Sequence, residues 1–181
     1  IVVELVEYKI RGLLDEGRTE AAFRMIVSQY GEQLYWRIRK LVIMHEDAND
    51  VLQNVFVKIW KGLDTFRFES KLMTWMHRIA TNESLNFLNE KRRKVYGNQV
   101  EIGEILANSL ESDAYISGSE MSLKLQRALL ELSERQRLIF NMRYFEDMSN
   151  EDVANELEIA VGTVKATYHQ AVKKIEEYLK D

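Results

Sequence analysis

The chain has 181 residues, of which 46% are hydrophobic and 30% are charged, and it contains no proline and no cysteine. The hydrophobic share is large enough to bury a core, which excludes global disorder, and the lack of cysteine excludes disulfides and thiolate metal sites. With only eight glycines, the composition favours helix throughout and predicts an all-α fold of one ordinary or two small domains.

The net charge of −4 is unevenly distributed along the chain. Residues 1–94 hold 16 Lys and Arg against 13 Asp and Glu, residues 95–120 hold five acids and no cation, and residues 121–181 hold nine cations against 11 acids. Nucleic-acid binding needs local positive charge, because cations displace the counterions of phosphates. The distribution therefore permits a nucleic-acid partner but predicts weak binding to free DNA, with a partner protein supplying the remaining affinity.

No run of 18 or more apolar residues is present, so neither a transmembrane helix nor membrane insertion is predicted. The first ten residues are too short and too charged for a signal peptide, and we expect a cytoplasmic protein. We find no nucleophile–base pair, no phosphate-binding glycine loop and no metal-ligand spacing, so we expect neither an enzyme nor a cofactor.

Two helices are predicted in the first 44 residues. The first ends at a turn around Gly17. The second runs from about residue 20 to 44, with apolar side chains at helical spacing at Phe23, Ile26, Tyr30, Leu34, Ile38, Leu41 and Val42. The neighbouring cations Arg37, Arg39 and Lys40 are interpreted as a solvated face, with contact to phosphate or to a partner as the alternative.

A third helix is predicted over residues 47–63. Its apolar residues share one face that must be buried, namely Val51, Leu52, Val55, Phe56, Ile59, Trp60 and Leu63. The opposite face carries a polar strip that the core does not require, made of Asp50, Gln53, Asn54 and Lys61. This strip is predicted to bind a partner, with an ordinary solvated surface as the alternative.

Residues 64–71 form an elbow that is unusual for a turn, because it holds Phe66 and Phe68 and lacks both glycine and proline. One ring is explained as a core residue. The other, with Arg67 beside it, suits the stacking of an unpaired base, which contributes on the order of 1–3 kcal/mol. The alternative is that both rings are buried.

A fourth helix is predicted over residues 72–94. Six side chains fall within roughly an 80° sector of it, at about 100° per residue: Trp75, Arg78, Asn82, Asn86, Asn89 and Arg93. Such groups stack on bases, read base edges and pair with phosphates, and Arg92 adds to the cationic run that ends the helix. The sequence thus predicts a solvent-facing surface for nucleic acid, although a core position for Trp75 explains that residue equally well.

Residues 95–120 are rich in Gly, Ser and Asn and contain five acids and no cation. This composition indicates a linker, with one helical turn around residues 102–106. From residue 121 the helical period returns. Capping boxes are predicted at Ser133 with Gln136 and at Ser149 with Asp152.

The last helices have helix-turn-helix spacing. Val153, Ala154 and Leu157 are predicted to face inward, residues 158–160 to form the turn, and the following helix to enter the major groove. Its outward or flanking residues are Gly162, Thr163, Lys165, Ala166, Thr167, His169, Gln170 and Lys173.

Three segments, in this order, together resemble bacterial RNA polymerase sigma factors of the extracytoplasmic-function (ECF) group: DANDVLQNVFVKIW (47–60), TWMHRIATN (74–82) and AVGTVKATYHQA (160–171). The resemblance implies that Asp50, Gln53 and Asn54 dock on core RNA polymerase. It also implies that the elbow and the fourth helix bind and melt the minus-ten element of promoter DNA, and that the last helix reads the minus-thirty-five element.

The chain departs from the family pattern at two places. Asn54 replaces a more usual acid, and Ala166, Thr167 and Gln170 stand where Ser, Arg and Arg are common. Since a bidentate contact carries roughly 1–3 kcal/mol of discrimination, the upstream element should differ from the usual one or be read more weakly.

The sequence therefore predicts a promoter-specificity subunit with a docking and melting domain (1–94), an acidic linker (95–120) and a helix-turn-helix domain (121–181). The resemblance also implies an anti-sigma factor as a partner. One alternative is a stand-alone helix-turn-helix regulator whose N-terminal part binds an effector or dimerises. Another is an all-helical adaptor that binds only proteins.

Overall fold

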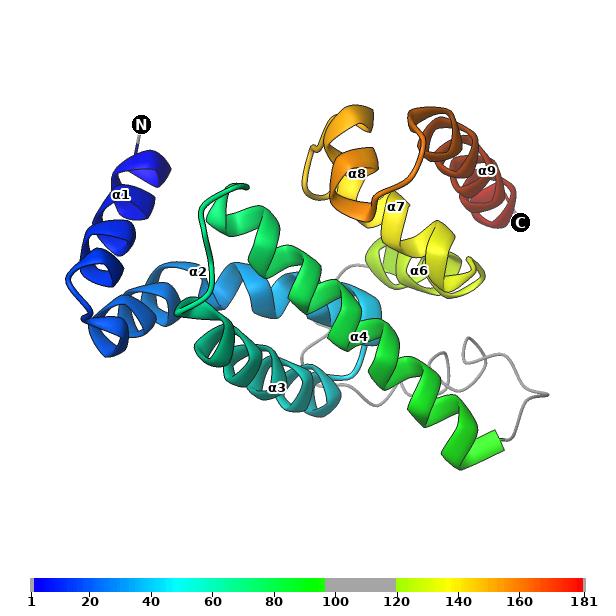
Figure 1. Cartoon of the computed structure of the whole chain (residues 1–181). Helices are drawn as coiled ribbons and strands as arrows, with labels where there is room; N and C mark the ends of the chain where they lie inside the picture. Colours follow the sequence, from blue (N-terminus) through cyan, green and yellow to red (C-terminus); the bar gives the residue numbers. More distant parts are fainter. Residues whose placement is uncertain (1, 97–119, 181) are drawn as a thin grey trace.

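The computed structural model describes residues 2–96 and 120–180, and within these ranges the chain folds into helices without any strand (Figure 1). The predicted all-α class is confirmed. The helices are α1 (Val2–Asp15), α2 (Thr19–Val42), α3 (His45–Leu63), α4 (Leu72–Tyr96), α6 (Glu120–Leu130), α7 (Glu134–Tyr144), α8 (Asn150–Leu157) and α9 (Val161–Lys180). The predicted helical turn and nearly all of the predicted linker lie outside the described residues.

Helices α1 to α4 enclose the first core, in which α2, α3 and α4 pack on one another and α1 packs on α2. The inward residues are fully buried, among them Ile26, Leu34, Ile38, Val51, Val55, Ile59, Leu72, Met76 and Ala80. Their spacing of three or four residues is what places them on one face of each helix. The predicted inner faces of α2 and α4 are confirmed.

Two polar contacts fix the ends of these helices. The Glu7 carboxylate of α1 accepts a hydrogen bond from the Leu72 N–H at 2.9 Å, which satisfies a free donor at the start of α4. Thr19 Oγ1 donates to Asp64 Oδ1 at 3.0 Å and so joins the start of α2 to the end of α3.

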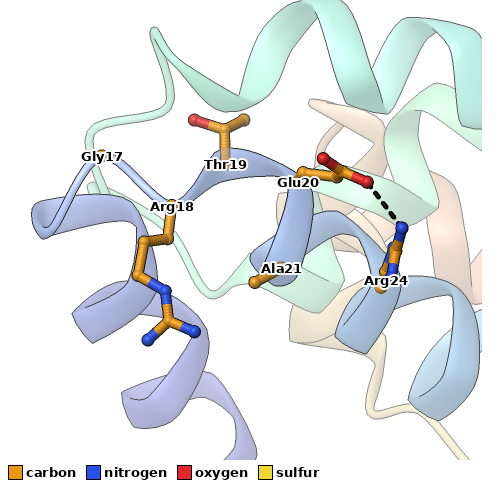
Figure 2. A pocket seen from close by; sticks show the side chains of 6 residues that line it. All are labelled: Gly17, Arg18, Thr19, Glu20, Ala21 and Arg24. Atoms are coloured by element: carbon orange, nitrogen blue, oxygen red, sulfur yellow. Dashed lines mark hydrogen bonds and ion pairs between the residues drawn. The ribbon is translucent and has the colours of Figure 1, made fainter.

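Figure 2 shows the pocket at the α1–α2 turn, where Arg24 pairs with Glu20 at 2.6 Å. Gly17 allows this turn, since its φ of +72° is unfavourable for other residues.

Helices α6 to α9 form the second domain, in which α9 packs on the other three helices. Its buried residues include Ala128, Leu132, Ile139, Phe140, Met142, Val153, Val164, Ala171 and Ile175. Ser133 and Gln136 form the predicted reciprocal capping box at the start of α7. At α8 only half of the predicted box forms, because Ser149 Oγ accepts from the Asp152 N–H but donates to the Asp152 carboxylate.

The two domains are packed against each other, α7 on α2 and α8 on α4 (Figure 1). Leu41 and Leu85 of the first domain join an apolar cluster of the second. Arg137 donates to the main-chain oxygen of Leu41 at 3.1 Å, and Asn141 donates to that of Lys40 at 3.2 Å. Burial lowers the pKa of Arg137 to about 10, opposed by nearby Glu134. The described domains are thus closed on each other.

Within the described ranges, no helix combines the length and the apolar character that crossing a membrane requires.

Candidate nucleic-acid interface

The elbow between α3 and α4 holds a continuous aromatic cluster. The Phe66 ring stacks on Trp75, with centroids 4.7 Å apart, and lies tilted against Phe68, also at 4.7 Å. All three residues are only partly buried. Phe66 and Phe68 therefore match neither the prediction of one core ring and one free ring nor the alternative of two buried rings. The cluster presents aromatic surface to solvent, which suits the stacking of a base.

Phe68 is held in an unfavourable backbone conformation. Its φ of +56° lies in the left-handed region, which costs a residue with a Cβ roughly 1–2 kcal/mol. The guanidinium carbon of Arg11 in α1 lies 5.2 Å from the centroid of the Phe68 ring, at cation–π distance. Strain of this kind persists only where surrounding contacts hold it, and it is common at binding sites. Arg67, between the two phenylalanines, is exposed.

The Trp75 ring is positioned by a glycine at the end of α3. A Cβ built on Gly62 would lie 2.7 Å from Trp75 Cζ2, closer than side chains approach one another. The ring therefore fits against bare backbone on one side and against Phe66 on the other.

We predict that Gly62→Ala destabilises the fold although alanine is the better helix former. The gain in helix propensity is up to about 1 kcal/mol, whereas overpacking typically costs about 1–3 kcal/mol. Thermal unfolding should show a lower midpoint and tryptophan fluorescence a displaced ring. Gly12→Ala in α1 is the matched control, because a Cβ there meets nothing within 4 Å and should stabilise the helix. Equal stabilisation by both substitutions would contradict this packing.

The predicted nucleic-acid face of α4 is only partly free. Asn82, Asn86, Asn89 and Arg93 are exposed, as predicted. Arg78, however, donates to the main-chain oxygens of Asn155 and Glu156, at 2.9 and 3.2 Å. The prediction that the whole line faces solvent is therefore wrong, because the second domain binds its first guanidinium and leaves the Arg78 side chain only 39% exposed.

The cationic run at the end of α4 is also partly engaged. Arg92 pairs with Glu134 of the second domain, and Lys91 pairs with Asp47 of α3 at 2.5 Å. Arg93 and Lys94 remain exposed. Two of the four cations thus satisfy acids of this chain.

The residues predicted to dock on polymerase, here called the docking strip, lie on the exposed face of α3. Asp50, Gln53 and Asn54 are all exposed. Val57 and Trp60 extend this face at three- and four-residue spacing and are 51% and 43% exposed. The prediction that Trp60 is buried is wrong: its ring contacts Phe23, with centroids 5.3 Å apart, but the residue remains 43% exposed.

The prediction that Arg37, Arg39 and Lys40 form a solvated face is wrong for the two arginines, while Lys40 is partly buried. Arg37 and Arg39 are buried, with 4% and 7% of their surface exposed. Arg37 donates to Glu146 at 2.7 Å and to Glu156, both in the second domain. The sequence holds a signal for this, since Arg37 stands three residues after Leu34 and four before Leu41, on the inward face of the helix.

The helix-turn-helix has its recognition helix open to solvent. Glu158 adopts φ +56° at the end of α8, and Val164 and Ala171 anchor α9 to the core. The predicted reading residues are exposed apart from Thr167, which is partly buried: Gly162, Thr163, Lys165, Ala166, His169, Gln170 and Lys173. Exposed side chains along one helix are what entry into a major groove requires.

The three histidines lie on different helices, α3, α4 and α9. In the part of the chain that the structure describes, no three His, Cys, Asp or Glu side chains are placed to hold a metal ion.

Comparison with known proteins gives matches over both domains. The model of sigma-70 region 2 matches residues 26–94, and that of sigma-70 region 4 matches residues 122–175. The ECF RNA polymerase sigma factor SigW of Bacillus subtilis is 26% identical over 168 residues, covering 88% of this chain and 90% of SigW. The ECF sigma-E factor of Escherichia coli K12 is 27% identical over 165 residues, covering 87% of this chain and 86% of that protein.

A solved structure supports the fold. The sigma factor RpoE of Bartonella quintana, solved in complex with the anti-sigma factor NepR, aligns with a TM-score of 0.66 at 22% identity. The alignment covers 87% of this chain and 96% of that chain.

Proposed function

Because this chain belongs to the ECF group of sigma-70 factors and is a promoter-specificity subunit of RNA polymerase, we propose that its two domains divide promoter recognition between them. Residues 1–94 dock on core polymerase and melt the minus-ten element, residues 121–181 bind the minus-thirty-five element, and residues 95–120 link them. The observation that carries this division is that the docking strip of α3 and the reading face of α9 are both exposed and belong to different domains.

Docking is assigned to Asp50, Gln53 and Asn54. These side chains cover no part of the core, and Val57 and Trp60 add apolar surface beside them. A polar strip with an aromatic neighbour is a common composition for a protein interface.

Melting is assigned to the aromatic cluster and the face of α4. A base leaving the duplex would stack on Phe66, Phe68 or Trp75, which contributes on the order of 1–3 kcal/mol per base. That gain is comparable to the few kcal/mol required to unstack and unpair the base. Capture can therefore drive opening without ATP. The groups proposed to contact the opened strand lie in the elbow and along α4: Arg67, Arg78, Asn82, Asn86, Asn89, Arg92 and Arg93.

Reading of the upstream element is assigned to α9. Gln170 has the amide that pairs with adenine, and the methyl groups of Ala166 and Thr167 suit the methyl group of thymine. Lys165 and Lys173 supply phosphate contacts, with Gly162, Thr163 and His169 at the groove. This set favours an A/T-containing element over one read by two arginines.

The chain is expected to act in the cytoplasm, where RNA polymerase works, and to have no catalytic activity of its own. Since the relative from Bartonella quintana was solved with an anti-sigma factor, we propose that an anti-sigma factor also binds this chain.

The phosphate contacts are tested by salt dependence. Lys173→Ala, and separately Arg93→Ala, should each lower the slope of log affinity against log salt by about one, measured for holoenzyme on a promoter fragment. Lys9→Ala is the control, an exposed cation on α1 with no proposed DNA contact. An unchanged slope for Lys173→Ala would show that α9 does not approach the phosphates.

A further inference from the structure

The contact between the two domains contains deeply buried charges. We define the junction ion cluster as Arg37, His77, Glu146 and Glu156. The Arg37 side chain is 3% exposed, and both of its acidic partners come from the C-terminal domain. The Glu156 side chain is equally buried, and it meets Arg37 and, at 3.6 Å, His77 Nδ1. Charged groups are rarely buried this far unless they are paired.

Closure of the domains also occupies a residue proposed to contact DNA. Three groups of α8 and the following turn hold the Arg78 guanidinium: the oxygens of Asn155 and Glu156, and the Glu158 carboxylate at 3.2 Å. A guanidinium has five N–H donors in a fixed plane, and here each of its three nitrogens contacts a protein acceptor, which leaves fewer donors for phosphates. Arg92 is held in the same way by Glu134.

The closed form is too compact to read both promoter elements. Their nominal positions differ by roughly 25 base pairs, which is about 85 Å at about 3.4 Å per base pair. Helix α8 contacts α4 directly and packs on α9, a helix of 20 residues. The reading face of α9 therefore lies within about one such helix length, roughly 30 Å, of that contact.

We propose that the junction ion cluster holds this chain in an autoinhibited closed form, in which the helix-turn-helix domain covers part of the minus-ten surface and must leave it before a promoter is read. The proposal rests on the proposed function, because it assigns a DNA role to Arg78. The closed form itself is defined by contacts within the chain.

Substitutions in the junction ion cluster should shift the equilibrium between the closed and open forms of the chain. In the open form Arg37 and Glu156 are both hydrated, so removal of one charge costs little there. In the closed form, loss of Arg37 leaves Glu156 buried with His77 as its remaining partner, and loss of Glu156 leaves the buried Arg37 with Glu146 as its remaining acidic partner. Each removal therefore destabilises the contact between the domains. Replacement of both by apolar residues removes the most deeply buried pair and leaves only Glu146, whose side chain is 17% exposed, without Arg37, so the closed form should return. All hydrogen-bond and ion-pair partners described for the Glu156 carboxylate belong to the N-terminal domain, so its loss should leave each domain folded.

Distance measurements test the proposal. The chain has no cysteine, so spin labels can be placed at Lys9→Cys and Glu176→Cys, on exposed positions of α1 and α9. In this background the unaltered junction should give one short distance by pulsed electron paramagnetic resonance. Glu156→Gln and Arg37→Gln should each raise the population at longer distance at least tenfold. Glu151→Gln, an exposed acid on the same helix, should leave the distribution unchanged.

The combined Arg37→Leu and Glu156→Leu variant should restore the short distance, which a merely damaged domain would not do. Unchanged distributions in both single-charge variants would overturn the proposal. Addition of core polymerase and promoter DNA should lengthen the distance in the otherwise unaltered chain, and a promoter complex that keeps the short distance would overturn it as well. Failure of every variant to bind polymerase would instead contradict the proposed function, while the distances would still decide whether the cluster closes the chain.

Discussion

Phe68→Gly is expected to lower promoter opening roughly 5- to 150-fold, the equivalent of one lost base stack of about 1–3 kcal/mol. The same substitution should change the free energy of unfolding by less than about 1 kcal/mol. Glycine relieves the left-handed φ of +56°, worth roughly 1–2 kcal/mol, and this offsets the lost burial of a partly exposed ring. Opening is measured by permanganate reactivity of unpaired thymines, and stability by denaturant unfolding.

A premelted template separates base capture from docking. On a promoter whose minus-ten element is mismatched, the unpairing step is already complete, so the Phe68→Gly holoenzyme should recover most of its activity. Equal loss on duplex and premelted templates would show that Phe68 acts in another step. A fall in stability of several kcal/mol would contradict the account of the strained backbone.

The second large effect is expected on α3. Asp50→Ala combined with Gln53→Ala should weaken binding to core polymerase roughly 30- to 900-fold, since the loss of one charged and one neutral hydrogen-bonding group amounts to about 2–4 kcal/mol. Both side chains are exposed, so the free energy of unfolding should change by only about 0.5 kcal/mol. Affinity is measured by fluorescence anisotropy with labelled sigma subunit.

Gln29→Ala is the matched control for this variant, because Gln29 is an exposed glutamine on α2, outside the docking strip. It should leave polymerase affinity unchanged. If the double variant binds polymerase as tightly as this control, docking does not use the strip on α3.

Local patterns predicted the helices well. The spacing of Val51, Val55 and Ile59 identified the inner face of α3, and Ser133 with Gln136 identified the start of α7. These features depend on residues a few positions apart, so helical periodicity and capping chemistry are sufficient to find them. The motif order likewise identified the two domains and their family.

The errors lie where contacts are distant in sequence. Arg37 reaches Glu146 and Glu156, more than 100 positions further along the chain, and nothing in the helix containing Arg37 specifies those partners. Arg78 was placed correctly on its helix face, but the domain that covers it begins beyond the linker. The prediction that Trp60 is buried is wrong for another reason. Trp60 lies at the edge of an apolar face, where its large ring is only partly covered.

This chain gives core RNA polymerase its choice of promoter. The most direct measurement is to reconstitute the chain with core polymerase, transcribe a genomic DNA library and sequence the transcript starts. We predict starts that share a pair of elements near minus ten and minus thirty-five and that vanish when the chain is omitted. A protein that leaves the pattern of starts unchanged, yet binds a palindrome tightly without polymerase, would contradict the claim.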